Sequence, residues 1–273
     1  MTSPDFEHNL QKYAELIVKV GLNLQPGQRL AVIADIQAAP LVRLAAAQAY
    51  QLGCRLVDVI WDDEAVTLTR FQHAPRDSFE EFPDWKVKAL TEYAQRGDAL
   101  LSITSADPDL LAGQDAELIN LSQRARAEKQ RPFAELVSRS AMNWAIAGYA
   151  VPAWAARVFP NVSADRQVPQ LWEAIFDVCR IWHDDPVGEW RQHIRNLNRR
   201  SDYLNARRYA GLHYTGPGTD LTIGLADGHI WKAGATRSQT GIDFVANLPT
   251  EEVFTLPNAP HTHGHVSSTK PLS

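Results

Sequence analysis

The first half of this chain alternates aliphatic runs with amphipathic segments, and this pattern most strongly constrains the fold. Four runs have the length of strands and are mostly apolar: RLAVIAD, RLVDVIWDD, DALLSIT and NWAIAGYA. Between them, apolar residues recur every three or four positions, as they do from Leu10 to Val20, which is the period of a helix with one buried face. Strands that are apolar on both faces and alternate with helices predict an α/β fold, a parallel sheet with helices on both faces.

One long helix is expected from Gln114 to Arg139. Pro132 stands inside this stretch. A proline inside a helix removes a backbone hydrogen bond and crowds the preceding turn. We therefore expect an interruption of the helix at Pro132.

The pattern changes after about residue 160. An apolar helix is expected over QLWEAIFDVCRIW, and a second helix should begin at DDPVGEW, with Asp185 as its N-cap and Pro186 at its first position. The stretch GLHYTGPGTDLTIGLADGHIWKAGA then predicts three short strands with turns at GPG and ADG. We expect a domain boundary near residues 180–190, with an α/β domain over residues 1–185 and a β-rich (α+β) domain over residues 186–273.

Composition excludes several classes of protein. The 27 basic residues nearly balance the 32 acidic ones, so a net charge of −5 gives no reason to expect nucleic acid or an anionic membrane as a partner. A count of two cysteines excludes a disulfide framework, and the absence of a CxxC pair excludes a zinc ribbon. No secretory signal and no apolar run of roughly 18 residues is present. We expect a soluble, cytoplasmic protein.

Nucleotide binding and serine chemistry find little support. The first strand-to-helix connection, ADIQAAPLV, contains no glycine, although a phosphate cradle needs glycines for close approach of the backbone. The GPGTDL segment at Gly216–Leu221 is expected to be a hairpin turn, because it leads into a strand and not into a helix. Ser102 lies in an apolar run without a GxSxG motif and is expected to be structural.

The histidines divide into a scattered set and a cluster. Each scattered histidine is interpreted as a surface or capped core residue; these are His8, His73, His183, His193, His213 and His229. His261, His263 and His265 have a period of two, which on a strand would place them on one face, where they could bind zinc. Pro257, Pro260 and Gly264 favour a solvated loop instead, and a loop is the interpretation that we prefer.

Glu251 and Glu252 are the stronger candidates for site residues. They precede the strand-like run Val253–Thr255. Neighbouring residues on a strand point to opposite faces, so at most one of the two would enter a shared site. A carboxylate that faces an interior is costly unless it is paired or bound to a metal. Two interpretations stay open from the residues alone: a metal or substrate carboxylate, or an exposed pair at the start of a strand.

Several motifs together resemble a known family. NLPTEEVFTLPN, with GPGTDLTIGL and Trp231 before it and STKPL after it, is similar to the thermophilic-type metallo-aminopeptidases (aminopeptidase T, aminopeptidase S and PepS). DDPVGEWRQHI and the opening YAELIVKVGLNLQPGQRLAVIAD fit the same family. The resemblance is colinear and extends over essentially the whole chain.

The resemblance implies a cytoplasmic, dimeric exopeptidase of two domains that releases N-terminal amino acids from peptides. It implies two divalent metal ions (zinc, cobalt or magnesium) held by carboxylates and histidines. One ligand of the family lies in PTEEVFT and maps to Glu251 or Glu252, whereas His261, His263 and His265 fall in a variable connection.

The family's other ligands lie beyond STKPL. We therefore expect this chain to be an N-terminal portion that has little activity alone. The alternative is a non-catalytic α/β protein that dimerises or binds a partner.

Overall fold

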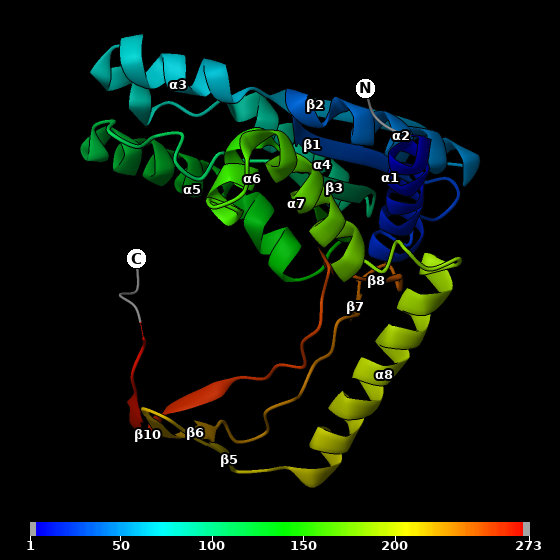
Figure 1. Cartoon of the computed structure of the whole chain (residues 1–273), viewed down its shortest axis with the longest axis vertical. Coiled ribbons are helices and arrows are strands. Elements are labelled where there is room, and N and C mark those ends of the chain that lie inside the picture. The colour runs from blue at the N-terminus through cyan, green and yellow to red at the C-terminus, as the bar shows by residue number, and fades with distance from the viewer. Residues whose placement is uncertain (1–3, 270–273) are drawn as a thin grey trace. The chain divides into compact units, whose positions relative to one another are not determined.

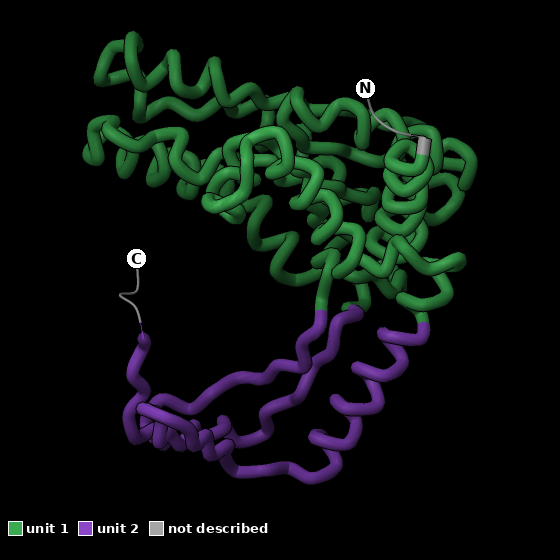
Figure 2. The backbone as a smooth tube through the Cα atoms, in the orientation of Figure 1, with its two compact units in different colours: residues 1–191, 236–250 green, residues 192–235, 251–273 purple. Residues whose placement is uncertain are grey.

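The structure is a computed structural model that describes residues 4–269. The chain forms two compact units (Figure 2): unit 1 comprises residues 1–191 and 236–250, and unit 2 comprises residues 192–235 and 251–273. The last crossing from unit 1 to unit 2 comes directly before Glu251. Residues 270–273, which include most of the STKPL motif, lie outside the described part of the chain.

Unit 1 is built on a five-stranded sheet in the order β2-β1-β3-β4-β9. The strands β2, β1 and β3 of this sheet are labelled in Figure 1. All neighbouring strands in the sheet are parallel; they are β1 (Arg29–Asp35), β2 (Leu56–Asp62), β3 (Ala99–Thr104), β4 (Trp144–Gly148) and β9 (Asn247–Leu248). The aliphatic runs predicted the first four strands, and the expected α/β fold is confirmed. The fifth strand was not predicted.

Helices pack on both faces of this sheet. On one face, Leu90 and Ala94 of α4 (Asp84–Gln95) pack in a cluster that includes the strand residue Leu100, and Trp144 lies against it. Ala145 points to the opposite face because side chains alternate along a strand. There, a Cβ atom on Gly21 would lie 3.3 Å from the Cβ of Ala145, so the chain that follows α1 approaches this second face closely.

The other helical segments of unit 1 are α1 (Pro4–Leu16), α2 (Ala39–Gln51), α3 (Glu64–His73), α5 (Ala116–Ser138), α6 (Pro152–Val158) and α7 (Ala164–Val178), with the short turns η1 (Ile17–Gly21), η2 (Ile36–Ala38) and η3 (Arg76–Glu80). Two short antiparallel strands, β7 (Thr236–Arg237) and β8 (Asp243–Phe244), complete the unit. The interruption expected at Pro132 is wrong, because α5 continues through it. Phe133, Leu136 and Val137 pack against the core, and this burial offsets the lost hydrogen bond.

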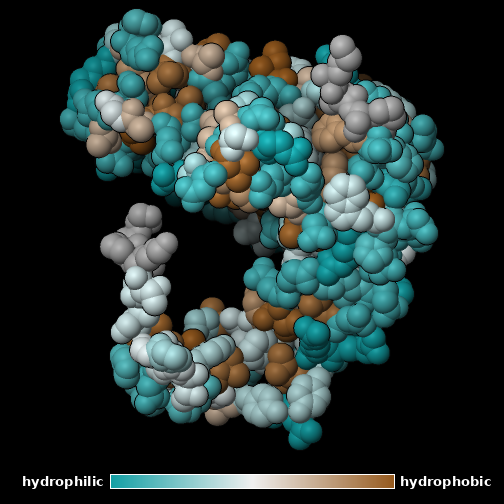
Figure 3. All heavy atoms as spheres, in the orientation of Figure 1, coloured by the Kyte–Doolittle hydropathy of each residue, from teal (hydrophilic) through white to brown (hydrophobic). Residues whose placement is uncertain are grey.

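The helix α8 (Pro186–Arg207) begins in unit 1 and continues into unit 2. As expected, Asp185 caps it, since its Oδ1 atom accepts a hydrogen bond of 2.9 Å from the backbone of Gly188. Trp190 and Leu197 are buried. Hydrophilic residues make up most of the surface of α8 that is visible in Figure 3. Among the described residues, no helix has both the length and the apolar character needed to span a membrane.

Unit 2 contains an antiparallel sheet in the order β10-β6-β5, formed by β5 (Gly211–Gly216), β6 (Thr219–Leu225) and β10 (Pro257–Val266). The hairpin turn expected at GPG is confirmed by the pairing of Gly216 with Thr219. The third strand expected after the ADG turn is wrong, because this stretch forms only an isolated bridge between Lys232 and Phe254.

The loop expected at the histidine cluster is also wrong, since this segment is β10. Proline is tolerated there because β10 is an edge strand, and its pairing with β6 shifts register between Asn258 and His263, around Pro260. Gly264 has a φ of +120°, and a Cβ atom there would lie 2.1 Å from the carbonyl oxygen of Asp220. Glycine thus permits the close approach of the two strands.

Candidate functional site

One face of α8 organises the candidate site in unit 2. His193, Leu197, Ser201 and Asn205 follow one another at intervals of four residues, so their side chains lie on the same side of the helix. Leu197 and Ser201 are buried, and the side chain of His193 is only 14% exposed. Other segments of unit 2 therefore cover this face.

The segment around Trp231 is the first of these. Asn205 accepts a hydrogen bond of 2.8 Å from the backbone N–H of Trp231 and donates one of 3.0 Å to its carbonyl oxygen. The hydroxyl of Ser201 donates to the same carbonyl at 2.8 Å. The amide of Asn205 thus satisfies both backbone groups of Trp231, as a neighbouring strand would.

The Trp231 segment in turn holds the chain that follows the two glutamates. Lys232 and Phe254 exchange two backbone hydrogen bonds, of 2.8 Å and 2.9 Å. Thr255 donates from its hydroxyl to the carbonyl oxygen of Ile230 at 3.0 Å. A continuous series of contacts therefore leads from α8 through residues 230–232 to residues 254–255.

Glu251 makes the most informative contact. Its Oε2 atom lies 3.2 Å from Nε2 of His193. The two side chains form an ion pair when the imidazole is protonated. The Glu251 side chain is 60% exposed, so one carboxylate oxygen contacts the helix while the group stays open to solvent. The contact restricts the orientation of the carboxylate.

The glutamates differ from the expected strand arrangement. Neither Glu251 nor Glu252 lies in a strand; in residues 251–256 only Phe254 forms a bridge. The alternation of strand faces therefore does not apply to the two glutamates. Both residues are exposed. The cost of burying a carboxylate therefore does not indicate which of the two glutamates binds a ligand.

His193 was missed by the reasoning from sequence, which treated it as one of the scattered histidines. Its partner Glu251 is distant in the chain, and no local motif joins the two. The available signal was its position on one helix face with Leu197, Ser201 and Asn205, which shows that the face is covered by another segment.

The histidines of β10 lie elsewhere in unit 2. His263 is opposite Thr222 and His265 is opposite Asp220, so both lie on one face of the sheet, and both are exposed. Asp220 contacts Nε2 of His213 at 2.8 Å.

Within residues 4–269, no group of three or more His, Cys, Asp or Glu residues converges on a point where a metal ion could bind. Glu251 and His193 have the right donor atoms for a divalent ion such as zinc. Two donors are fewer than the three protein ligands of a catalytic zinc site.

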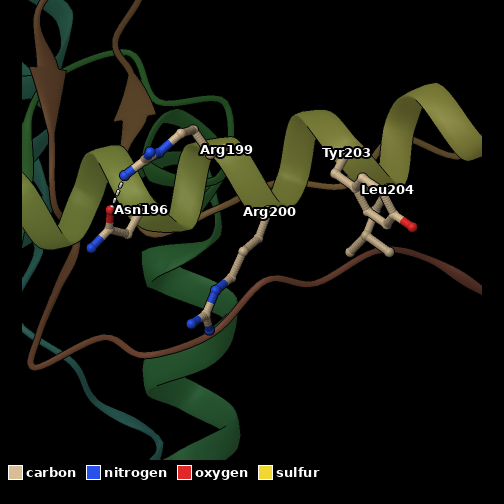
Figure 4. A pocket seen from close by; sticks show the side chains of 5 residues that line it. All are labelled: Asn196, Arg199, Arg200, Tyr203 and Leu204. Carbon is tan, nitrogen blue, oxygen red and sulfur yellow. Dashed lines mark hydrogen bonds between the residues drawn. The ribbon is translucent and has the colours of Figure 1, made fainter.

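An open cavity of about 610 Å³ lies against α8, further along the helix (Figure 4). It is lined by Asn196, Arg199, Arg200, Tyr203 and Leu204, and the guanidinium of Arg199 donates a hydrogen bond to the side-chain oxygen of Asn196. The described residues around it supply two guanidinium groups and no carboxylate, so this surface suits an anionic group better than a metal ion.

Comparison with known proteins identifies the family. The model of the family "Thermophilic metalloprotease (M29)" matches residues 6–273. The chain is 43% identical over 268 residues to Aminopeptidase 2 of Geobacillus stearothermophilus, and 41% identical over 268 residues to Aminopeptidase AmpS of Bacillus subtilis; each match covers 98% of this chain and 65% of the relative.

A solved structure, wild-type AmpT from Thermus thermophilus, superimposes with a TM-score of 0.89 at 40% identity, over 95% of this chain and 64% of that one. The chain thus spans about 65% of the length of the curated relatives that it matches. The resemblance to metallo-aminopeptidases is confirmed, and the chain belongs to the thermophilic metalloprotease (M29) family.

Proposed function

We propose, on the premise that the chain belongs to the thermophilic metalloprotease (M29) family, that it forms part of a metal-dependent aminopeptidase that releases N-terminal amino acids from peptides. Its relatives are named as aminopeptidases. The observation that carries the proposal is the contact of Glu251 with His193, because it orients a carboxylate of the PTEEVFT motif while leaving it open to solvent.

Glu251 and Glu252 are the metal ligands in this proposal. Carboxylate oxygens suit zinc, cobalt and magnesium, and the proposal takes two such divalent ions. Since the described residues bring together no group of three donors, these two residues would hold metal only with further donors. A bound divalent ion would lower the pKa of a water molecule and polarise the peptide carbonyl.

The other residues of the site hold the glutamates in place. His193 is a positioning residue, because its ring nitrogen lies 3.2 Å from one carboxylate oxygen of Glu251. Residues that orient a ligand in this way raise metal affinity. Asn205 and Ser201 act less directly, through the backbone of Trp231 and its bridge to Phe254.

The proposal has further parts that rest on the family resemblance. Residues 186–273 belong to a metal-binding catalytic domain, the partner beside peptide substrate is a second copy of the protein, and the location is the cytoplasm. Because no group of three donors converges among residues 4–269, we expect these residues to support little hydrolysis without further donors. The competing function is that of a non-catalytic protein that dimerises or binds a partner.

The experiment that tests the proposal is a chimera. Residues 1–273 replace the matching segment of the Geobacillus aminopeptidase, and hydrolysis of leucine p-nitroanilide is measured with cobalt, with zinc and after chelation. We expect hydrolysis that EDTA abolishes and added metal restores. A folded chimera without hydrolysis, or with hydrolysis that EDTA leaves unchanged, would contradict the proposal. Inactivity together with dimers of the chain in sedimentation experiments would favour the competing function.

A further inference from the structure

Unit 1 contains a cavity that is separate from the candidate site. It has a volume of about 720 Å³ and lies between α1, α7 and the residues that follow β4. Its wall is largely aromatic and carries a few polar groups; the residues that matter here are Phe6, Tyr149, Trp172, Trp182, Asp5, Asn9 and Glu173. A cavity of this size can hold a small organic molecule.

Several pairs of the aromatic rings stand nearly at right angles, whereas Trp172 and Phe176 are tilted by only 34°. The ring of Tyr149 lies 5.0 Å from that of Trp172 at an interplanar angle of 86°, and the rings of Phe176 and Trp182 are 5.6 Å apart at 88°. Trp172 and Phe176 are buried, whereas Trp182 is 52% exposed. The wall therefore extends from the core to solvent, and its rings face several directions.

The charged side chains of the cavity are negative. Asp5 and Glu173 contribute carboxylates, and among residues 4–269 no lysine or arginine lines the cavity. Arg166 approaches Glu173 only to 3.8 Å, and the Glu173 side chain stays 58% exposed. An ion pair of this kind contributes little and leaves the carboxylate open to a ligand.

Asn9 supplies a third polar group. It is only 9% exposed and lines the cavity. Among residues 4–269 its side-chain amide has no hydrogen-bond partner, and its oxygen and nitrogen are not fully buried. A ligand in the cavity would therefore find this amide free to donate and to accept.

We propose that this cavity binds a small organic cation that carries an alkylammonium group. The faces of Tyr149 and Trp182 would hold the cation by cation–π attraction, and the carboxylates of Asp5 and Glu173 would balance its charge. The amide of Asn9 would bond to a polar group of the same ligand. A neutral apolar ligand would leave all three polar groups unused.

The place of the cavity in the fold supports the proposal. Tyr149 directly follows β4, so the cavity lies at the carboxyl end of a parallel strand. Ligands of open α/β sheets bind at this end of the strands. The proposal does not depend on the peptidase function.

The test compares choline with its neutral isostere 3,3-dimethyl-1-butanol, both titrated into the full chain by calorimetry and tryptophan fluorescence at constant ionic strength. We expect saturable binding of choline at one site, at least tenfold tighter than binding of the alcohol. The Trp182→Leu variant should weaken choline binding about tenfold. Trp85→Leu is the matched control, because Trp85 is 59% exposed and lies outside the cavity, and it should bind as the parent does.

A second variant separates charge from shape. Glu173→Gln should weaken choline binding severalfold and leave binding of the alcohol unchanged. Three outcomes would each overturn the proposal. The first is equal binding of choline and the alcohol, and the second is no choline binding at about 50 millimolar, a concentration that corresponds to roughly 2 kcal/mol. The third is choline binding that Trp182→Leu does not alter in a protein with an unchanged circular dichroism spectrum.

Discussion

Replacing Asn205 with alanine should loosen the segment that carries the candidate site, without unfolding the protein. The side chain of Asn205 accepts from the backbone of Trp231 at 2.8 Å and donates to it at 3.0 Å. Each such bond contributes roughly 0.5–1.5 kcal/mol, so the loss of both should cost about 2 kcal/mol. The bridge of Lys232 and Phe254 should then open about 30-fold more often, since every 1.4 kcal/mol is a factor of about ten.

Hydrogen exchange of backbone amides measures this opening directly. The amides of Lys232 and Phe254 should lose about 30-fold in protection in Asn205→Ala, while those of β1 in unit 1 keep theirs. Asn198→Ala is the matched control, because Asn198 is an exposed asparagine on the same helix. Unchanged protection of Phe254 in Asn205→Ala would refute the reasoning that α8 holds the glutamate segment through Trp231.

Three further predictions follow from individual contacts. Gly224→Ala should destabilise the pairing of β10 with β6 by roughly 1–3 kcal/mol, because the new Cβ atom would lie 2.5 Å from that of His261. Hydrogen exchange of the β10 amides should therefore become faster. Gly216→Ala, with no atom within 4 Å of its new Cβ, should have little effect on this exchange.

Burial raises the pKa of Cys179 to about 12. Iodoacetamide should therefore leave Cys179 unmodified at pH 8 and modify it increasingly above pH 10, as mass spectrometry would show. Rapid alkylation of Cys179 at pH 8 in the native protein would contradict this. His193→Gln in the chimera should weaken cobalt binding about tenfold or more in equilibrium dialysis, and a variant that binds cobalt as the parent does would show that the contact with Glu251 has no positioning role.

The fold was predictable where burial determines the sequence. The strands β1, β3 and β4 are buried along one face and mostly partly buried along the other, so apolar residues dominate both faces. The strand β9 has two residues and pairs with β4 across a large sequence separation, so no local pattern could indicate it. The strand β10 is polar and contains prolines, and only its edge position and its register shift make these compatible with a strand.

The candidate site was predictable only in part. Glu251 and Glu252 stand out because two carboxylates adjoin an apolar run. His193 does not, since the sequence of a helix indicates which face is covered but not which segment covers it. The contact of His193 with Glu251 depends on the bridge between Lys232 and Phe254, which joins segments that no motif connects.

The most direct test of the central claim is the metal content and activity of three chimeras that carry Glu251→Gln, Glu252→Gln or Glu128→Gln. Glu128 is an exposed residue on α5 in unit 1 and serves as the matched control. We expect at least one of the first two variants to lose bound metal and to fall about 100-fold or more in hydrolysis of leucine p-nitroanilide, while Glu128→Gln keeps both. Full metal content and activity in both Glu251→Gln and Glu252→Gln would contradict the claim that this motif binds the catalytic metal.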